Sequence, residues 1–108
     1  MAASAEFVVH MREQFAPLGG VSDAVFFGGR AFSWHGKQFA WVMGNSLYLR
    51  AGDATRAEFE AHGAQPFSYS TKKGLVLVRK FYTAPEFLMD DSEQLLAWAR
   101  KAIAAAGA

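Results

Sequence analysis

The sequence predicts an α+β fold, a two-layer sandwich in which an antiparallel sheet of about five strands packs against helices. Apolar residues near the N-terminus recur at spacings of three and four, as in a helix, and from residue 21 to residue 51 at a spacing of two, as in strands. The gaps between these strands are about two residues long. Such gaps are too short for a parallel crossover, so neighbouring strands must be antiparallel. A helical pattern returns at the C-terminus.

The first helix is predicted to start at Ser4, because serine is a favoured helix N-cap. Pro17 and the pair Gly19-Gly20 end it. One face of the helix carries the apolar side chains Phe7, Val8, Met11 and Phe15. The pattern is that of an amphipathic helix with one buried stripe.

Residues 21–51 are predicted to form a meander of three or four strands, since they are rich in aromatic and β-branched residues. Turns are expected at Gly28-Gly29, His35-Gly36 and Gly44-Asn45. Around Trp41 both alternating phases are apolar, which indicates a central strand covered on both faces. Candidates for the buried face of the sheet are Phe26, Phe27, Phe32, Trp34, Phe39 and Trp41.

A second helix is predicted after this meander. Asp53 is the expected N-cap, Phe59 the large apolar anchor, and Gly63 the residue past the C-terminal end. Two more strands follow at residues 66–70 and 75–81, joined by a basic turn. The predicted order, completed by a final helix, is α-β-β-β-α-β-β-α.

The final helix has a clear N-terminal signal. The acidic residues 90–93 favour the positive end of a helix, and a short helical turn is expected before them at Pro85. The alanine-rich end from Ala104 is expected to fray.

Length and composition limit what the protein can be. The 108 residues suit one domain, 1–108, and 52% of them are hydrophobic, enough for a real core. The net charge of +1 argues against a strong nucleic-acid or membrane-binding field. The absence of cysteine excludes disulfides, thiolate metal sites and cysteine nucleophiles. Neither a signal peptide nor a membrane-spanning run is evident, so we expect a cytoplasmic protein with no membrane partner.

The pair Gly28-Gly29 raises the question of a phosphate-binding loop. Such a loop needs a third glycine in the G-x-G-x-x-G spacing and a helix directly after it, whereas a strand-like segment follows here. The P-loop lysine motif is also missing. We therefore interpret the pair as a bend or bulge, where glycine relieves crowding or adopts a positive φ.

No set of side chains is typical of a catalytic or metal site. His10, His35 and His62 lie too far apart in the sequence for a local metal motif. A serine nucleophile signature is absent. The acidic residues 90–93 are explained by the start of a helix. The sequence thus predicts no enzyme activity, no metal and no cofactor.

Four basic residues are candidates for contact with nucleic acid or a partner. They are Lys72, Lys73, Arg79 and Lys80. Arg79 and Lys80 should point to opposite faces, because side chains alternate along a strand. A patch here would hold at most two or three charges, so a solvated hairpin is favoured and any binding of nucleic acid would be weak.

Several segments occur in a specific order along almost the whole chain. They are residues 15–19 (FAPLG), 27–32 (FGGRAF), 39–40 (FA), 47–51 (LYLRA), 53–69 (DATRAEFEAHGAQPFSY), 81–86 (FYTAPE) and 95–100 (LLAWAR). With these segments the chain resembles the TfoX N-terminal domain family of TfoX/Sxy proteins. The family-motif residues expected to be structural are Phe27, Gly28, Gly29, Pro66, Phe67, Tyr82 and Pro85.

The resemblance implies a two-layer sandwich with an antiparallel sheet, which agrees with the fold predicted from the residues. It also implies a link to natural competence, in which two-domain relatives act with the cyclic-AMP receptor protein to switch on DNA-uptake genes. The chain ends at Ala108, where longer relatives continue into a second domain, so a stand-alone N-terminal domain is expected. The resemblance carries over no catalytic residue.

The function expected on these grounds is a non-enzymatic regulatory or protein-interaction domain that acts on transcription through a protein partner. One alternative is a weak DNA-associated module that uses the turn Lys72-Lys73. Another is a small-ligand pocket between the aromatic sheet face and a helix, using Trp34, Trp41 or Tyr48, although core packing explains these side chains more simply. Aromatic residues make up 15% of the chain, which also favours a homodimer.

Overall fold

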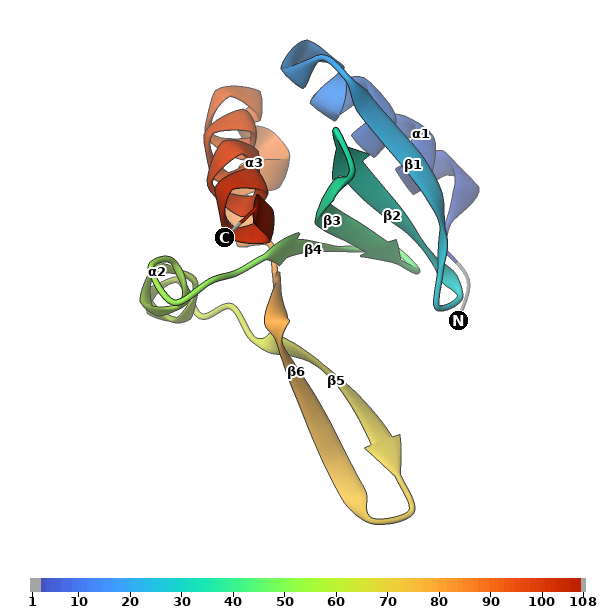
Figure 1. Ribbon diagram of the computed structural model, residues 1–108, viewed down its shortest axis with the longest axis vertical. Coiled ribbons are helices and arrows are strands. Elements are labelled where there is room, and N and C mark those ends of the chain that lie inside the picture. Colours follow the sequence, from blue (N-terminus) through green and yellow to red (C-terminus); the bar gives the residue numbers. More distant parts are fainter. Residues whose placement is uncertain (1–2, 108) are drawn as a thin grey trace.

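The computed structural model describes residues 3–107, which form a six-stranded antiparallel sheet with helices packed on it (Figure 1). The strands lie side by side in the order β1-β2-β3-β4-β6-β5. The helices, of which η1 and η2 are short 3-10 helices, are α1 (Ala5–Phe15), η1 (Ala16–Leu18), α2 (Arg56–Ala61), η2 (Glu86–Asp90) and α3 (Ser92–Gly107). The strands are β1 (Val21–Phe26), β2 (Gly29–Trp34), β3 (Lys37–Met43), β4 (Ser46–Arg50), β5 (Pro66–Thr71) and β6 (Gly74–Thr83).

The predicted α+β fold with an antiparallel sheet is confirmed, with six strands rather than about five. The first strand, β1, lies at one edge of the sheet, where it pairs with β2. None of its side chains is fully buried. An edge strand of this kind leaves only a weak period of two in the sequence, which is why the strand count of the meander stayed open.

Helix α1 confirms the predicted start and buried stripe. The backbone N–H of Phe7 donates to the Ser4 hydroxyl at 3.4 Å, so this serine caps the helix. Phe7 itself is half-buried. The side chains that α1 buries are Val8, Met11 and Phe15.

Helix α2 starts later than predicted, and Asp53 is not its N-cap. The helix begins at Arg56, after Thr55. The Asp53 carboxylate instead forms an ion pair with Arg56 at 2.8 Å, and the Thr55 hydroxyl accepts the N–H of Gly52 at 3.1 Å. These local contacts hold the preceding residues in a turn and delay the helix.

Helix α3 is capped by Asp91, whose carboxylate accepts the N–H of Gln94 at 3.1 Å. The helix continues to Gly107, so the expected fraying from Ala104 is wrong. The reason is packing, because a Cβ added to Gly52 would lie only 3.3 Å from the Ala105 side chain, so the alanine-rich turn rests against the chain before α2. None of the helices in the described residues is long and apolar enough to span a membrane.

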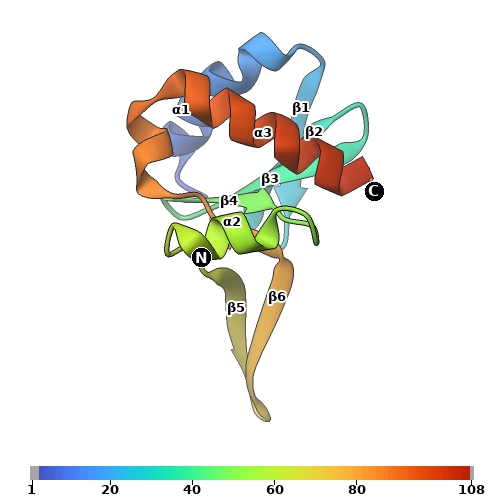
Figure 2. The same cartoon turned by 90° about the vertical axis from the view of Figure 1, so that its left-hand side faces the viewer.

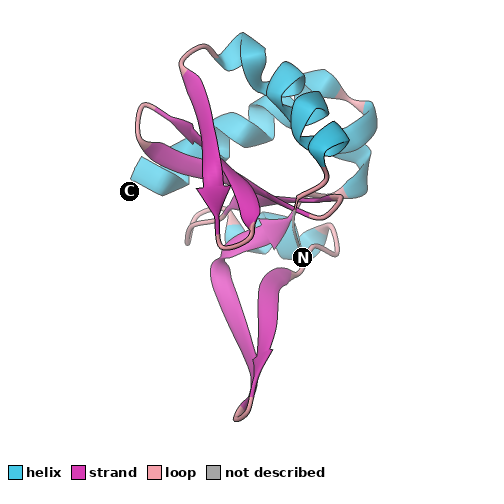
Figure 3. Ribbon diagram, turned by 90° about the vertical axis from the view of Figure 1, so that its right-hand side faces the viewer, coloured by secondary structure: helices cyan, strands magenta, loops and turns pink. Residues whose placement is uncertain are grey.

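All three α-helices contribute to one buried cluster on the same face of the sheet, which we call the helix-covered core. Figures 2 and 3 show α1 and α3 gathered on that side of the strands. Phe59 of α2 packs edge-on against Trp98 of α3, with ring centroids 5.0 Å apart. The sheet contributes to this core mainly through Phe32, Phe39, Ala40, Val42, Leu47, Leu49 and Tyr82.

Strand β3 buries side chains on both faces of the sheet, as predicted for this central strand. The register between β2 and β3 shifts next to Phe32, which pairs with Ala40 and leaves Phe39 as a bulge. The bulge lets Phe39 and Ala40 both join the helix-covered core. Trp41 belongs to a second, smaller cluster.

Strands β5 and β6 form a hairpin that projects from the rest of the molecule (Figures 1 and 3). Strand β6 lies between β4 and β5. It pairs with β5 at residues 74–78 and again at Tyr82, whereas only its residues 81–83 pair with β4. The outer half of the hairpin is therefore a two-stranded arm, and it accounts for the longest extent of the molecule, 42 Å.

The segment around Gly28-Gly29 forms a turn and a close backbone contact, as interpreted from the sequence. Phe27 and Gly28 occupy the β1–β2 turn with φ values of 44° and 78°. At Gly29 an added Cβ would clash with the carbonyl oxygen of Val42 and would lie 2.6 Å from Nε1 of Trp41. The expectation that Phe27 lies on the buried face is wrong: its side chain is 79% exposed, because the turn directs it outward.

Candidate functional site

The face of the sheet opposite the helix-covered core carries a second cluster of aromatic side chains, which we call the open face. Its buried members are Ala31, Trp41 and Phe81, and packed against them are Phe26, Met43, Tyr48 and Phe67. A groove of about 680 Å³ opens on this face between the β1–β2 turn and the β5–β6 hairpin. The residues that line this open-face groove are Phe26, Phe27, Gln38, Trp41, Arg50, Phe67, Tyr69, Val78, Lys80 and Phe81.

Trp41 is the centre of the open face. Its ring meets Phe67 edge-on with centroids 4.5 Å apart, and Phe26 in the same way at 5.8 Å. Its indole N–H donates to the backbone carbonyl of Phe26 at 3.1 Å, which satisfies its polar atom. The floor of the groove is therefore held in place by packing and by a hydrogen bond.

The rim of the groove is exposed and apolar. Phe27 stands on the β1–β2 turn with 79% of its surface exposed, and Tyr69 on β5 is 48% exposed. These two aromatic side chains come from opposite ends of the sheet order. A pocket floor of buried aromatic rings with an exposed apolar rim is typical of a surface that binds another molecule.

The charged residues that line the open-face groove are both basic. Arg50 lies over the ring of Phe81, with its guanidinium carbon 5.5 Å from the ring centroid. Lys80 is exposed at the same groove. Nearby, burial raises the pKa of Tyr48, so its hydroxyl stays neutral at physiological pH. The groove thus favours a ligand that is apolar and negatively charged.

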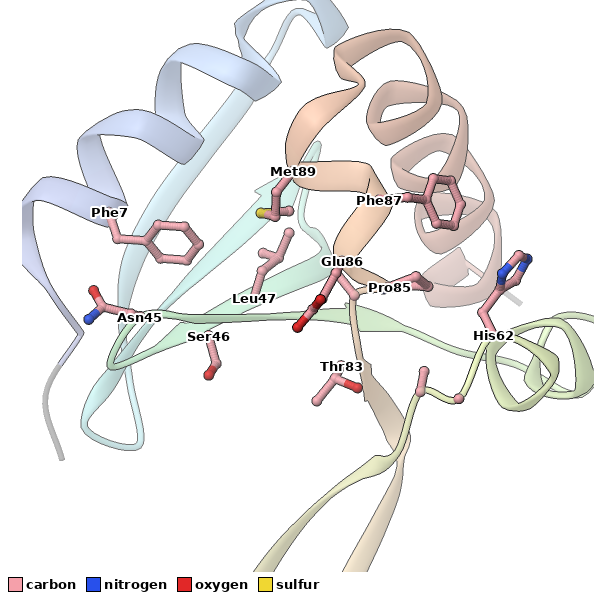
Figure 4. A pocket seen from close by; sticks show the side chains of 13 residues that line it. Phe7, Asn45, Ser46, Leu47, His62, Thr83, Pro85, Glu86, Phe87 and Met89 are labelled. Carbon is pink, nitrogen blue, oxygen red and sulfur yellow. The ribbon is translucent and has the colours of Figure 1, made fainter.

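A second groove lies on the helix side, below η2, and we call it the η2 groove (Figure 4). It has a volume of about 890 Å³. Phe7 of α1 and Met89 of η2 point into it above Leu47, whereas Phe87 points away toward His62, with ring centroids 5.2 Å apart. The charged carboxylate in its lining is that of Glu86. Sequence analysis did not foresee this groove, because its walls come from four segments that are distant in the chain.

The histidines lie apart, and each packs against an aromatic ring. His10 stacks on Phe7, and His35 packs edge-on against Trp34 with centroids 4.2 Å apart. His62 follows α2 as its C-cap residue. Within residues 3–107, no group of three or more His, Cys, Asp or Glu side chains could hold a metal ion.

The four basic candidate residues lie at two separate places on the hairpin. Lys72 and Lys73 are exposed at its tip. Arg79 and Lys80 are exposed near its base, roughly 20 Å away at the usual rise of a strand. Lys80 lines the open-face groove. The structure thus brings Lys80 together with Arg50 and not with the lysines of the tip.

The tryptophan and tyrosine residues considered for a ligand pocket do not meet in one site. Trp41 and Tyr48 lie on the open face, with ring centroids 5.7 Å apart. Trp34 packs against the helix-covered core instead. The open-face groove, which Trp41 lines, has no helix residue in its lining, so it is not the expected pocket between sheet and helix.

The remaining family-motif residues lie where the hairpin joins the sheet. Pro66 pairs with Tyr82, whose hydroxyl donates to the Glu60 carboxylate at 2.7 Å. Burial, and then this hydrogen bond, raise the pKa of Tyr82. Phe67 joins the open face, and the buried Pro85 precedes η2.

Comparison with known proteins identifies the family of the chain. A family model described as the TfoX N-terminal domain matches residues 13–106. No match to a curated protein was found. The match covers the whole sheet, α2, η2 and nearly all of α3, but only the C-terminal end of α1. The chain therefore belongs to the TfoX N-terminal domain family.

Proposed function

We propose that this protein is a non-enzymatic regulatory domain that binds a protein partner and acts on transcription through it. Family membership supports a domain like that of competence regulators. A regulator of transcription works where the DNA is, so the proposal includes a cytoplasmic location and no membrane partner. The domain needs no cofactor for this role.

The observation that carries the proposal is the open-face groove. Its floor is rigid, since Trp41 is packed against Phe67 and hydrogen-bonded to the backbone of Phe26. Rigid aromatic side chains lose little conformational entropy on binding, which is why they dominate the energy of protein interfaces. Phe27 and Tyr69 offer exposed apolar area around this floor.

The basic side chains narrow the class of partner. Arg50 and Lys80 both border the groove and have no ion pair among the described residues. A segment with one or two aromatic or aliphatic side chains next to acidic residues would fill the groove and neutralise both cations. The proposed occupant is therefore an apolar, acidic segment of a regulatory protein.

The test is a calorimetric titration with the purified cyclic-AMP receptor protein, the partner that the family resemblance names. Phe27→Ser removes an exposed apolar side chain from the rim, and Lys80→Glu reverses a charge at the groove. Each is expected to weaken binding about tenfold or more. Leu77→Ser is the matched control, because Leu77 is exposed on the hairpin outside the groove.

Two results would contradict the proposal. One is equal affinity of the wild type, the two groove variants and Leu77→Ser. The other is substrate turnover that a groove variant abolishes.

A second candidate function rests on Lys72 and Lys73 at the hairpin tip. Both are exposed and lack an ion pair among residues 3–107, so they favour contact with phosphate groups. Two cations would support only weak association with DNA. A mobility shift at low salt that Lys72→Ala and Lys73→Ala together remove would support this role, and no shift at low salt would exclude it.

A further inference from the structure

The η2 groove, which the proposed function leaves unused, offers apolar surface to another molecule. Leu47 of β4 is buried at its base, while Phe7 and Met89 point into it from α1 and η2 (Figure 4). Phe7 is half-buried, and Met89 keeps 37% of its surface exposed. The groove is also larger than the open-face groove, with about 890 Å³ against about 680 Å³. Apolar side chains gathered around an open groove are typical of a docking surface.

The segment that forms one wall of this groove is acidic. Residues 81–99, which include η2 and the first half of α3, contain four carboxylates and no lysine or arginine. The four are Glu86, Asp90, Asp91 and Glu93. All are exposed, and none forms an ion pair within residues 3–107. Glu86 lines the groove itself, so the negative charge lies next to the apolar surface.

The two grooves of the molecule therefore differ in the sign of their charge. The charged side chains that line the open-face groove are Arg50 and Lys80. The η2 groove has Glu86 and no lysine or arginine in its described lining. Juxtaposed like charges weaken association and opposite charges favour it. An acidic segment suited to the open-face groove would thus be disfavoured at the η2 groove, which selects a basic occupant.

The polar groups of the η2 groove suit a peptide. Figure 4 shows Asn45 and His62 at opposite ends of the groove, with Glu86 between them. The hydroxyls of Ser46 and Thr83 belong to the same lining. The Thr83 hydroxyl accepts the N–H of Gln65 at 3.0 Å, and its own proton remains available to donate. An elongated apolar groove with polar groups along its length matches a peptide, whose backbone carries donors and acceptors throughout.

We propose that the η2 groove binds a basic, apolar peptide segment of a second protein partner. Apolar side chains of this segment pack against Phe7, Leu47 and Met89, and a lysine or arginine next to them pairs with Glu86. The domain then holds two segments of opposite charge, one on each face of its sheet. This inference goes beyond the proposed function and does not depend on it, because the two grooves share no lining residue.

The test is fluorescence anisotropy with two labelled synthetic peptides. Both carry leucines at helical spacing, and the remaining positions are lysine in one peptide and glutamate in the other. The leucine–lysine peptide is expected to bind the full chain at the η2 groove. Glu86→Lys and Met89→Ser should each weaken its binding about tenfold. The leucine–glutamate peptide should bind no more weakly to these two variants than to the wild type.

Each variant has a matched control. Glu93→Lys reverses an exposed charge of the same acidic segment outside the groove lining. Val9→Ser removes an exposed apolar side chain of α1, also outside this lining. Both controls should bind the leucine–lysine peptide nearly as tightly as the wild type. An equal loss in Glu86→Lys and Glu93→Lys would overturn the proposal, because general attraction and not the groove would then hold the peptide.

Three further results would also overturn it. The first is no binding of the leucine–lysine peptide to the wild type. The second is a wild-type dimer in sedimentation equilibrium that Glu86→Lys dissociates, since the occupant would then be a second copy of this chain. The third is displacement of the peptide by hexylammonium at equal concentration, which would assign the groove to a small organic cation.

The two proposals fail in different ways. Phe27→Ser and Lys80→Glu should leave binding of the leucine–lysine peptide unchanged, whereas they weaken occupation of the open-face groove. Loss of peptide binding in Glu86→Lys therefore does not bear on the open-face groove. If Met89→Ser lowers the melting temperature in circular dichroism, Glu86→Lys and the milder Glu86→Gln decide, because Glu86 is exposed and its replacement leaves no cavity.

Discussion

Both faces of the sheet carry aromatic side chains, but on one face they form a buried core and on the other they form a partly exposed surface. On the helix-covered side, Phe32 and Phe39 are completely buried. On the open face, Trp41 and Phe81 are buried by other sheet residues, while Phe27 and Tyr69 at the rim remain exposed. The difference lies in the helix layer, which excludes water from one face. Aromatic content alone thus does not separate a core from a binding surface.

The largest expected effect comes from opening the helix-covered core. Phe39→Ala should lower the free energy of unfolding by about 3–5 kcal/mol, because it leaves a cavity beneath α3 and Phe15. Urea denaturation measures the change. A loss no greater than that of an open-face variant would contradict the distinction between the two faces.

The next effect concerns the contact between the β1–β2 turn and the open face. Gly29→Val should cost about 3 kcal/mol, because its side chain would overlap the Val42 carbonyl and the Trp41 ring. Thermal unfolding followed by circular dichroism measures it. Gly36→Ala is the control: unlike Gly29, Gly36 has a positive φ of 81°, but nothing lies near an added Cβ, so the change should cost less. An unchanged melting temperature together with lost nucleotide binding would reverse our interpretation of this segment.

A smaller effect is expected within the open face itself. Phe67→Ala should cost about 1–2 kcal/mol, because Phe67 is only half-buried and its loss exposes Trp41 to water instead of leaving a sealed cavity. Chemical denaturation and tryptophan fluorescence report stability and exposure together. A red-shifted emission with little loss of stability fits an accessible surface. A cost equal to that of Phe39→Ala would show that this face is a second core.

The smallest expected effect is the pH dependence of stability that arises from Asp23 in the edge strand β1. Hydrogen bonding to Arg12 lowers the pKa of Asp23, and the Arg30 interaction acts in the same direction against the effect of burial. The ionised Asp23 carboxylate therefore stabilises the fold at pH values above its unfolded pKa of about 3.9. This contribution is lost as the pH falls through the lower pKa that Asp23 has in the folded state. Denaturation of wild type and Asp23→Asn at neutral and acidic pH measures it. A stability difference that grew on acidification would contradict the assignment.

Local chemistry accounts for the parts of the fold that the sequence predicted well. The Ser4 cap, the buried stripe of α1, and the turns at Gly28, Gly36 and Gly44 depend on residues close in the chain, and all occur in the structure. The N-cap of α2 was misassigned because Asp53 had a competing local partner in Arg56. Such competition depends on side-chain conformation, which spacing alone does not reveal.

The candidate site was harder to predict than the fold. Trp41 and Lys80 were each singled out from the sequence, but nothing in their spacing indicated that they border the same groove. Phe67 was expected to be structural, and it also forms part of the floor. A period of two in β5, shared by Phe67 and Tyr69, was the signal that these residues lie on one face.

By itself the sequence determined the helices, the turns, the antiparallel pairing and the family, because these depend on short-range spacing and on segment order. Only the tertiary structure decided which sheet face the helices cover, that β6 lies between β4 and β5, and which aromatic side chains remain accessible. A period of two separates the faces of a strand without saying which face is buried. That choice is made by the helices, which reach the sheet from distant parts of the chain.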